Sequence, residues 1–550
     1  MNRSAMLRVA RLAVAGAVGA MLLSACGGGG GSAGTPLNGS NSSGGGSVVG
    51  GGGNTGGNTG GNEPIKPSST YAQQCAPGNT EAAANLRKGS LDTEKSWIRA
   101  YFDEAYLWRE DVPSINAAAS AYSGSVVETA LNAYFDDLLS PARTASGKRK
   151  DQFSFMMSTR EWNALSQGGV EVGYGIEWSM KSPTPPRGLR VAFVEPGSVA
   201  DQAGVRRGDT LVTADGAAAD AADATGVNTL NGALFPDTAG GHRFVLTSVA
   251  GATRDVTLVA GNVTKTPVPA SQVLTAADGA KVGYLLFNDH ILTAEAQLIA
   301  AVNSFRAGGV SDLVVDLRYN GGGYLFIASE LAYMIAGDAA TSGKTFEQLR
   351  YNSKRSAETN SADSKTPFFS QACLLSGNNC TSQQPLPALN LRRVFVLAQA
   401  GTCSASEALI NGLRGVDVEV VLIGGTTCGK PYGFTAKDNC GYSYFPIEFV
   451  GTNNKGFGDY ADGFVPAGPG ATGVQGCQVA DDFNHPLGDV NEGMLAAALQ
   501  YRGNGTCPAA SPSESGSARA MGVRAAGADA VELRLRKLAA RSNRILGGRP

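Results

Sequence analysis

The chain has 550 residues, and 43% of them are hydrophobic, so it can form sizeable cores in several domains. Its formal net charge of −2 at pH 7 argues against a protein that binds nucleic acid, because no overall positive field attracts phosphates. The chain holds nine cysteines but only three histidines, which limits the kinds of metal site that it can build.

Residues 1–26 have the three parts of a secretory signal, namely arginines, a short apolar run and small residues before Cys26. The run from Leu12 to Leu23 is too short for an ordinary membrane-spanning helix. The sequence LSAC resembles the bacterial lipobox, in which the cysteine becomes the lipid-carrying first residue. We therefore expect lipidation at Cys26 and a protein anchored on the periplasmic side of the cell envelope, at the outer membrane in preference to the inner.

Residues 27–80 are expected to form a flexible linker. Half of the positions from 27 to 62 are glycine (18 of 36), and Ser, Thr and Asn fill most of the others. Such a stretch cannot bury enough apolar surface to order itself. The sequence thus predicts a globular body tethered to a membrane surface.

The cysteines other than Cys26 number eight, and an even number in an exported protein favours disulfides. The short-range pairs Cys373–Cys380 and Cys428–Cys440 are the first candidates. A zinc site is the competing interpretation, but no close Cys-x-x-Cys pair exists, so we expect no metal.

Residues 81–168 are expected to form an N-terminal helical region. The segment DTEKSWIRAYFDEAYLWRE begins with a capping-type Asp92 and spaces its apolar residues along one broad face. The segment SVVETALNAYFDDLLS repeats this pattern, and Pro141 ends it. This region is interpreted as a helical packing module.

Residues 169–265 consist of short β-rich runs separated by glycines. The sequences GYGIEW, PGSVADQAGVRRGD and DTLVTADG resemble those of a PDZ domain. The resemblance implies that extended peptides, often with a free C-terminus, bind by adding a strand to a sheet edge. An unrelated small β-domain is the alternative.

Strands and helices alternate over residues 270–507, which predicts a core of parallel βαβ layers. The expected strands are KVGYLLF, DLVVDLR, RRVFVLAQ and VEVVLIGG, and helices are expected over 293–307, from 325 and from 404. Residues 338–392 are polar, break this rhythm and are interpreted as an insertion. Residues 508–550 form a basic tail, which we expect to be solvated and partly disordered; a helix on an anionic surface is the alternative.

The segment AGTCSASEALINGLRG, residues 400–415, places Cys403, Ser404 and Ser406 at the start of a predicted helix. A serine at such a position is normally only a helix cap. However, Lys430 follows the next predicted strand, and the ends of parallel strands meet at one sheet edge. The glycines of DLRYNGGG follow a third strand and expose main-chain N–H groups. No motif places a histidine near these loops, which leaves Lys430 as the available base.

A lysine can act as a base only when its amine is neutral. At the ordinary pKa of about 10.4, roughly one lysine in 2,500 is neutral at pH 7. Lowering the pKa to about 7.5 takes roughly 4 kcal/mol, which burial can supply. A neutral Lys430 could then accept the proton of Ser404 as the serine attacks a carbonyl.

Three motifs together resemble those of the C-terminal processing (tail-specific) serine peptidases: SASE at 404–407, T-x-G-K at 427–430 and DLRYNGGG at 316–323. The resemblance covers roughly residues 90–500 in order. It implies an α/β fold with a ClpP/crotonase-like peptidase core, a small β-rich PDZ domain and an N-terminal helical region.

The resemblance also implies roles for individual residues. Ser404 would be the nucleophile and Lys430 the base, whereas Ser406 falls on the helix and is interpreted as structural. The oxyanion hole would come from the amide after the nucleophile, at Ala405, and from a glycine after the DLR strand. That glycine is Gly322 or its neighbour Gly323.

The sequence departs from the family pattern in two places. The interval between the serine and the lysine is one residue longer than is usual. The family commonly has a glutamine four residues after the lysine, and here that position is Phe434. No third catalytic residue is therefore carried over.

The sequence thus predicts a serine endopeptidase of the C-terminal processing type that cleaves exported proteins or peptides through a Ser–Lys dyad, without a cofactor. The PDZ domain would bind the C-termini of substrates. A catalytically inactive, peptide-binding lipoprotein is the alternative.

Two further alternatives are weaker. A thiol peptidase using Cys403 would need a histidine partner, and no motif places His290 or His485 for that role. A nucleotide-binding protein would use NGGG as a phosphate loop, but no Lys-Ser/Thr follows the glycines.

Overall fold

The computed structural model describes residues 64–509, except 183, 237, 377–378 and 469–470, together with the short strand Arg544–Ile545. The expected signal sequence with Cys26, the linker up to residue 63 and most of the basic tail lie outside the described residues. In the part of the chain that is described, no helix is both long and apolar enough to cross a membrane.

The expected N-terminal helical region is confirmed. It contains α1 (Leu91–Ala105), α2 (Val127–Asp137) and α3 (Thr159–Gly168), with strand β1 (Phe155–Ser158) before α3. Short 3-10 turns lie at Ala84–Leu86, Arg109–Asp111 and Ser120–Tyr122. The cap of α1 is Ser90 and not Asp92, because the Ser90 hydroxyl accepts a hydrogen bond from the N–H of Thr93 at 3.1 Å.

An aromatic cluster joins this region to the chain that follows Lys430. Trp97 of α1 packs against Tyr444, with ring centroids 4.8 Å apart, and Phe155 of β1 stacks on Phe445. Strand β1 pairs antiparallel with β21 (Tyr442–Phe445), which also pairs with β20 (Lys437–Asn439). The helical region therefore supports one of the predicted catalytic loops.

Residues 64–80 are folded, so the expected linker over 27–80 extends too far. They include a 3-10 turn at Ser68–Thr70 and Cys75, which is fully buried and forms a disulfide with Cys440. The glycine-rich composition that predicted the linker ends near residue 62, and the linker prediction for the positions after residue 63 is wrong.

The β-rich region forms one antiparallel sheet with two helices. The strand order is β2-β8-β7-β5-β4-β3, and β6 pairs with β5. The strands are β2 (Val170–Gly173), β3 (Ile176–Ser179), β4 (Arg190–Val194), β5 (Thr210–Ala214), β6 (Ala217–Ala218), β7 (Gly240–Thr247) and β8 (Thr253–Thr264), and the helices are α4 (Val199–Gln202) and α5 (Ala224–Leu234). Strand β3 ends the order and therefore offers an edge for a further strand.

The core contains a seven-stranded sheet in the order β23-β24-β18-β17-β11-β10-β9. Its members are β9 (Ala270–Thr275), β10 (Lys281–Leu286), β11 (Asp312–Asp316), β17 (Arg393–Ala398), β18 (Glu419–Gly424), β23 (Pro466–Ala467) and β24 (Val474–Gln478). Neighbouring strands are parallel except for β9, which is antiparallel to β10. The parallel α/β core expected from the sequence is confirmed.

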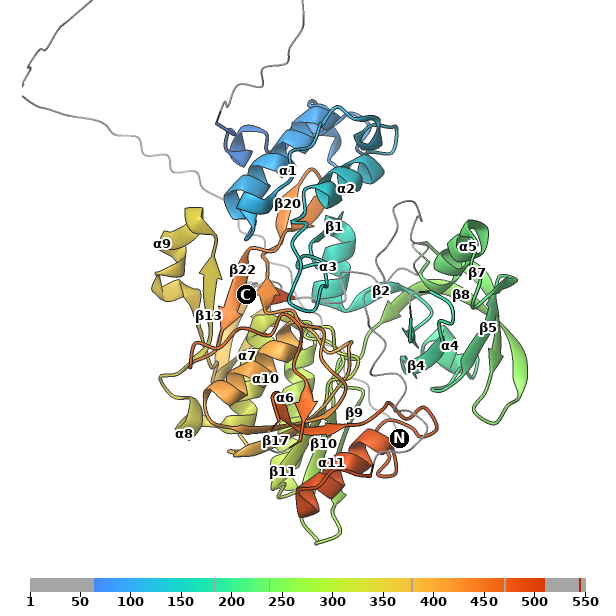
Figure 1. The fold of residues 1–550 in the computed structure, drawn as a ribbon, viewed down its shortest axis with the longest axis vertical. Helices are drawn as coiled ribbons and strands as arrows, with labels where there is room; N and C mark the ends of the chain where they lie inside the picture. Colours follow the sequence, from blue (N-terminus) through green and yellow to red (C-terminus); the bar gives the residue numbers. More distant parts are fainter. Residues whose placement is uncertain are drawn as a thin grey trace, which may run out of the picture. The chain divides into compact units, whose positions relative to one another are not determined.

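Helices cover both faces of this sheet (Figure 1). One face packs on α6 (Ala294–Ala307), α7 (Leu325–Ala336) and α10 (Ala405–Gly415), and the other on α11 (Gly493–Asn504). Successive strand residues alternate between the two cores: Val394 and Val396 face the first, whereas Phe395 and Leu397 face the second. Strands buried on both faces explain the continuous apolar runs in the sequence.

The described strands of the expected insertion, residues 338–392, do not join the seven-stranded sheet. Its elements are α8 (Asp338–Thr341), β13 (Thr345–Tyr351), α9 (Ser356–Thr359), β14 (Lys365–Pro367), β15 (Gln371–Ser376) and β16 (Asn379–Pro385), with 3-10 turns at Ser353–Arg355 and Ala362–Ser364. Strands β13 and β14 form a second sheet, in the order β14-β13-β22-β19, with β22 (Phe449–Thr452) and β19 (Tyr432–Gly433). Strands β15 and β16 form a hairpin.

Disulfide bonding is confirmed, but one expected pair is wrong. The pairs with both partners described are Cys75–Cys440, Cys403–Cys428 and Cys477–Cys507. Cys428 and Cys440 are therefore not partners of each other, because folding brings each of them closer to a cysteine of a different loop. Cys373 is also disulfide-bonded, whereas the side chain of Cys380 lies outside the described residues.

Two residues of the basic tail form strand β25, Arg544–Ile545. This strand pairs in parallel with β12 (Gly323–Tyr324), which directly follows the NGG sequence of the core. For these two residues the expectation of a disordered tail is wrong.

Candidate active site

Three neighbouring parallel strands carry the predicted catalytic motifs to one edge of the sheet. The NGGG loop follows β11, Ser404 follows β17 and Lys430 follows β18. The main-chain N–H of Cys403 donates to the carbonyl of Asn320 at 3.1 Å, which joins the first two loops. The loops expected to meet are therefore neighbours.

Ser404 has a strained main chain. Its main-chain angles are φ 59° and ψ −109°, a conformation that residues other than glycine rarely adopt. The residue is fully buried and lies directly before α10. Non-glycine residues in such conformations cluster at active sites, and a serine on a tight strand-to-helix turn is typical of a hydrolase nucleophile. An ordinary helix cap does not need this conformation, because a cap residue is normally extended.

The carboxylate of Glu407 binds the main chains of both candidate loops. Its Oε2 accepts hydrogen bonds from the main-chain N–H groups of Ser404 at 3.0 Å and Lys430 at 2.8 Å. Its Oε1 accepts from the N–H of Gly429 at 2.9 Å and from the hydroxyl of Thr427 at 2.5 Å. Glu407 is the last residue of the SASE motif, but the motif alone did not predict this role.

Burial raises the pKa of the Glu407 carboxyl above its usual value. Four hydrogen bonds oppose this effect, from the Thr427 hydroxyl and from the main-chain N–H groups of Lys430, Gly429 and Ser404. All four groups donate to the Glu407 carboxyl, so both of its oxygens act as hydrogen-bond acceptors.

A disulfide between Cys403 and Cys428 also links the two loops, with Cα atoms 5.2 Å apart. Because the sulfur of Cys403 is oxidised, it is not a thiol nucleophile, and the thiol-peptidase alternative is wrong for this form. The sulfurs of Cys403 and Cys428 and a carboxylate oxygen of Glu407 lie within 4.8 Å of one another. A metal would need thiolates there, which the disulfide excludes.

Lys430 is fully buried among aromatic side chains. Its Nζ lies 4.5 Å from the ring centroid of Phe434 and 5.1 Å from that of Phe153. Phe434, which replaces the family's common glutamine, is therefore in direct contact with the lysine. The aromatic faces favour a positive charge on Nζ, whereas burial favours the neutral amine.

The two candidate oxyanion glycines differ in what their N–H groups do. The N–H of Gly322 donates to Oδ1 of Asn320 at 2.9 Å, so this donor is already used. Gly323 lies at φ 137°, and a Cβ there would be 2.3 Å from the carbonyl oxygen of His290, so only glycine fits. Ala405 is the first residue of α10, where a main-chain N–H has no acceptor within the helix. We therefore take Gly323 and Ala405 as the candidate oxyanion donors.

His290 lies beside the NGGG loop, contrary to the expectation that no histidine is near. Its Nδ1 is 2.9 Å from Oδ1 of Asn320, and its main-chain N–H donates to the carbonyl of Gly322. Burial lowers the pKa of His290 to about 4, and hydrogen bonds to Asn320 and Gly322 partly offset this effect. In the sequence His290 follows soon after the expected strand KVGYLLF, which forms β10 beside β11, but no motif marks this position.

Ser406 has the structural role expected of it, because its hydroxyl donates to the carbonyl oxygen of Asn320 at 3.0 Å. It therefore helps to fix the NGGG loop against α10.

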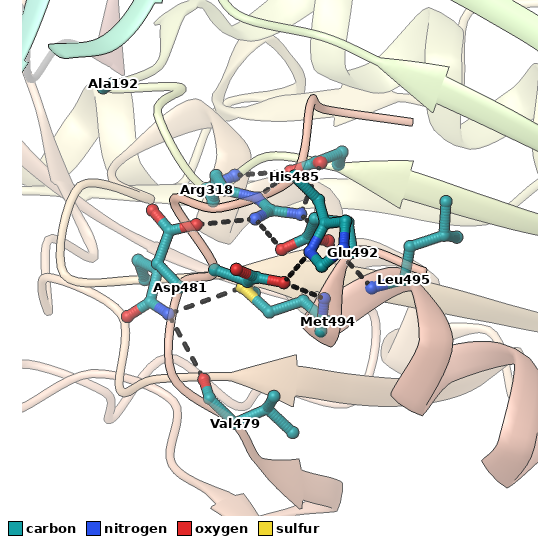
Figure 2. Close-up of polar contacts among 12 residues, drawn as sticks. Ala192, Arg318, Val479, Asp481, His485, Glu492, Met494 and Leu495 are labelled. Carbon is teal, nitrogen blue, oxygen red and sulfur yellow. Dashed lines mark hydrogen bonds and ion pairs between the residues drawn. The ribbon is translucent and has the colours of Figure 1, made fainter. Parts of the chain in front are cut away.

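The arginine of the DLR motif, Arg318, anchors the start of the NGGG loop through buried ion pairs. Arg318 is fully buried, and its guanidinium binds the carboxylates of Asp316, Asp481 and Glu492 at 2.7–2.9 Å (Figure 2). Glu492 in turn caps α11 by accepting a hydrogen bond from the N–H of Leu495. The motif thus fastens the end of β11 to the opposite layer of the core.

The β-rich region contacts the same network. Arg207, which precedes β5, donates to Oδ1 of Asp481 and to the hydroxyl of Tyr319, both at 2.6 Å. A cleft of about 220 Å³ is lined by residues 177–180 at β3 and by Gly321, Ala400 and Gly401 from the catalytic loops. The edge strand of the β-rich region and residues that neighbour the candidate site in sequence therefore line one cleft.

Comparison with known proteins identifies two segments. Residues 281–437 match the model of peptidase family S41, and residues 93–155 match that of the peptidase S41 N-terminal domain. A chloroplastic C-terminal processing peptidase from Tetradesmus obliquus is 29% identical over 280 residues, which cover 48% of this chain and 53% of the relative. A carboxyl-terminal-processing protease from Picosynechococcus sp. is 26% identical over 187 residues, which cover 33% and 43%. The chain thus spans about half the length of the curated relatives it matches.

A solved structure supports the fold. An S41 protease candidate from Bacteroides fragilis superposes with a TM-score of 0.53 at 24% identity, covering 74% of this chain and 97% of the other. Residues 281–437 of this α/β core and residues 93–155 of the helical region thus match domains of peptidase family S41.

Proposed function

We propose that the protein is a serine endopeptidase of the C-terminal processing type, with Ser404 as nucleophile and Lys430 as base. The observation that carries this proposal is the strained turn at Ser404. The main-chain N–H groups of Ser404 and Lys430 both donate to the carboxylate of Glu407. A fold does not hold a buried serine in this conformation without a use for it.

In this mechanism, the neutral amine of Lys430 takes the proton from the Ser404 hydroxyl as the oxygen attacks the scissile carbonyl. The N–H groups of Gly323 and Ala405 would bind the developing oxyanion. Lys430 then returns the proton to the departing amine, which leaves an acyl-enzyme. A water molecule, deprotonated by Lys430, hydrolyses the acyl-enzyme and restores the Ser404 hydroxyl.

We further propose that the β-rich region is a PDZ domain that delivers substrates. The exposed edge of β3 and the cleft shared with the catalytic loops support this role. A peptide added to β3 would gain main-chain hydrogen bonds without a strict sequence requirement. The substrates would then be exported proteins or peptides with accessible C-termini.

The proposed location is the periplasmic side of the envelope, through lipid on Cys26. The apolar signal, the LSAC sequence and the glycine-rich stretch support this location. Loss of membrane association in Cys26→Ser is the expected result, and unchanged membrane binding would contradict the anchor.

The experiment for the catalytic proposal uses a serine-reactive acylating probe together with hydrolysis of an unfolded protein. Ser404→Ala should abolish both signals, while Ser406→Ala is the matched control, because it removes a hydroxyl of the same loop that bonds only to a carbonyl. His290→Gln tests whether the histidine beside the NGGG loop can act as the base instead of Lys430, and it should leave labelling intact. Equal labelling of Ser404→Ala and wild type would overturn the proposal, and peptide binding without any labelling would indicate an inactive peptide-binding protein.

A further inference from the structure

A segment of the tail lies against the candidate active site. Strand β25 pairs in parallel with β12, with Arg544 opposite Gly323 and Ile545 opposite Tyr324. It also lies beside β19, which begins at Tyr432, two residues after Lys430. The segment therefore contacts the strand of the oxyanion glycine and the strand that follows the lysine.

Strand β25 pairs with the edge of β12 that carries the N–H of Gly323. The carbonyl of Gly322 accepts from the N–H of His290, and the N–H of Tyr324 donates to the carbonyl of His290, so both face His290. Main-chain groups of successive strand residues point to opposite edges. The N–H and C=O of Gly323 therefore face away from His290, toward β25.

That edge is where a substrate would lie under the proposed mechanism. The N–H of Gly323 is one of the two donors assigned to the oxyanion, so a main chain beside it occupies the position of a scissile peptide. Pairing of this kind depends on the main chain and tolerates many side chains. A segment of the same chain is also present at a high effective concentration.

We propose that strand Arg544–Ile545 is an intramolecular ligand of the active site, which occupies the substrate-strand position and inhibits the enzyme until it is displaced. This inference rests on the proposed peptidase function. It identifies the regulator of the site as an extended strand of the chain itself, recognised through its main chain and competing with the substrate.

The test compares two variants of the full chain. Ile545→Pro removes a main-chain donor and disfavours the strand, whereas Ile545→Ala keeps the donor and is the matched control. The readouts are the second-order rate of Ser404 acylation by a serine-reactive probe and kcat/KM for a fluorogenic peptide. Both should rise about tenfold in Ile545→Pro, as expected for a ligand with a local concentration of about 1 mM and an affinity of about 0.1 mM. Ile545→Ala should stay near wild type.

A synthetic peptide of residues 538–550 should slow the Ile545→Pro variant again, and the same peptide with proline at position 545 should not. Equal rates in wild type and Ile545→Pro, with labelling still dependent on Ser404, would overturn this inference alone. Labelling independent of Ser404 would overturn the proposed function instead. Intact-mass analysis gives one more outcome: cleavage within the segment in wild type, absent from Ser404→Ala, would make the segment a substrate and overturn its role as an inhibitor.

Discussion

Glu407 and Lys430 are joined by a hydrogen bond of 2.8 Å from the main-chain N–H of Lys430 to Oε2 of Glu407. The same oxygen accepts the N–H of Ser404, so one buried carboxylate sets the spacing of the main chain at both proposed catalytic residues. Glu407, the last residue of the SASE motif, therefore ties together the main chains at these two positions.

The first prediction concerns Glu407→Gln. The amide nitrogen of glutamine would face main-chain N–H donors, so at least one pair of hydrogen bonds is lost. We expect a loss of stability of about 2–4 kcal/mol and a fall in kcat with little change in KM. Urea unfolding and steady-state kinetics, at a temperature where the variant is fully folded, measure the two effects.

Glu448→Gln is the control, because Glu448 is also buried but binds Tyr101 and Arg355 instead of the catalytic loops. It should lose stability and keep kcat. An unchanged kcat in folded Glu407→Gln would contradict a positioning role for Glu407.

The second prediction concerns the disulfide between Cys403 and Cys428. Replacing both residues by serine opens a loop with a sequence separation of 25, which predicts a loss of about 3 kcal/mol. We also expect reduced kcat, because the bridge holds the residue before Ser404 against the lysine loop. The double replacement at Cys477 and Cys507, with a separation of 30, should cost similar stability without lowering kcat. Equal kcat values for the two double variants would contradict a catalytic effect of the bridge.

Part of this arrangement was predictable from the sequence. The strand order along the chain placed Ser404, Lys430 and NGGG at three strand ends, and parallel strands necessarily bring those ends to one edge. The partner of Cys428 was not predictable, because a disulfide depends on Cα atoms approaching to about 5 Å, and short sequence spacing does not ensure this approach. His290 was missed because a lone histidine after a strand has no motif. The strand at Arg544–Ile545 was missed because a two-residue main-chain pairing leaves no pattern in side chains.

The third prediction concerns His290 and acid stability. Its pKa is about 4 in the folded protein and about 6.5 when unfolded, so the unfolded chain binds its proton at higher pH. The contribution to stability is therefore fully present above pH 6.5 and is lost as pH falls through 4, by about 3 kcal/mol. His290→Gln should flatten the fall in unfolding free energy between pH 6.5 and 4, as followed by urea titration. Replacement of the more exposed His485 by glutamine should leave that fall in place.

The fourth prediction concerns the identity of the base. A lysine base works only when neutral, so kcat/KM should rise with pH until Lys430 has lost its proton. Lys430→Arg should be as inactive as Lys430→Ala, because a guanidinium stays charged at any working pH. Partial activity of Lys430→Arg, with a flat pH profile, would mean that position 430 supplies only positive charge.

The fifth prediction concerns Phe434, whose ring centroid lies 4.5 Å from Nζ of Lys430. The ring face attracts the protonated amine, by about 0.5–2 kcal/mol, and therefore disfavours the neutral form that accepts the serine proton. Phe434→Leu removes this attraction and keeps the site apolar, so the rising limb of kcat/KM should move to lower pH by about 0.4–1.5 units. Phe445→Leu is the control, because Phe445 packs on Phe434 with ring centroids 5.2 Å apart and loses a similar apolar contact one layer farther from the amine. A shift of equal size in both variants would assign the effect to repacking of the aromatic cluster, and a shift to higher pH in Phe434→Leu would show that the ring helps Lys430 to lose its proton.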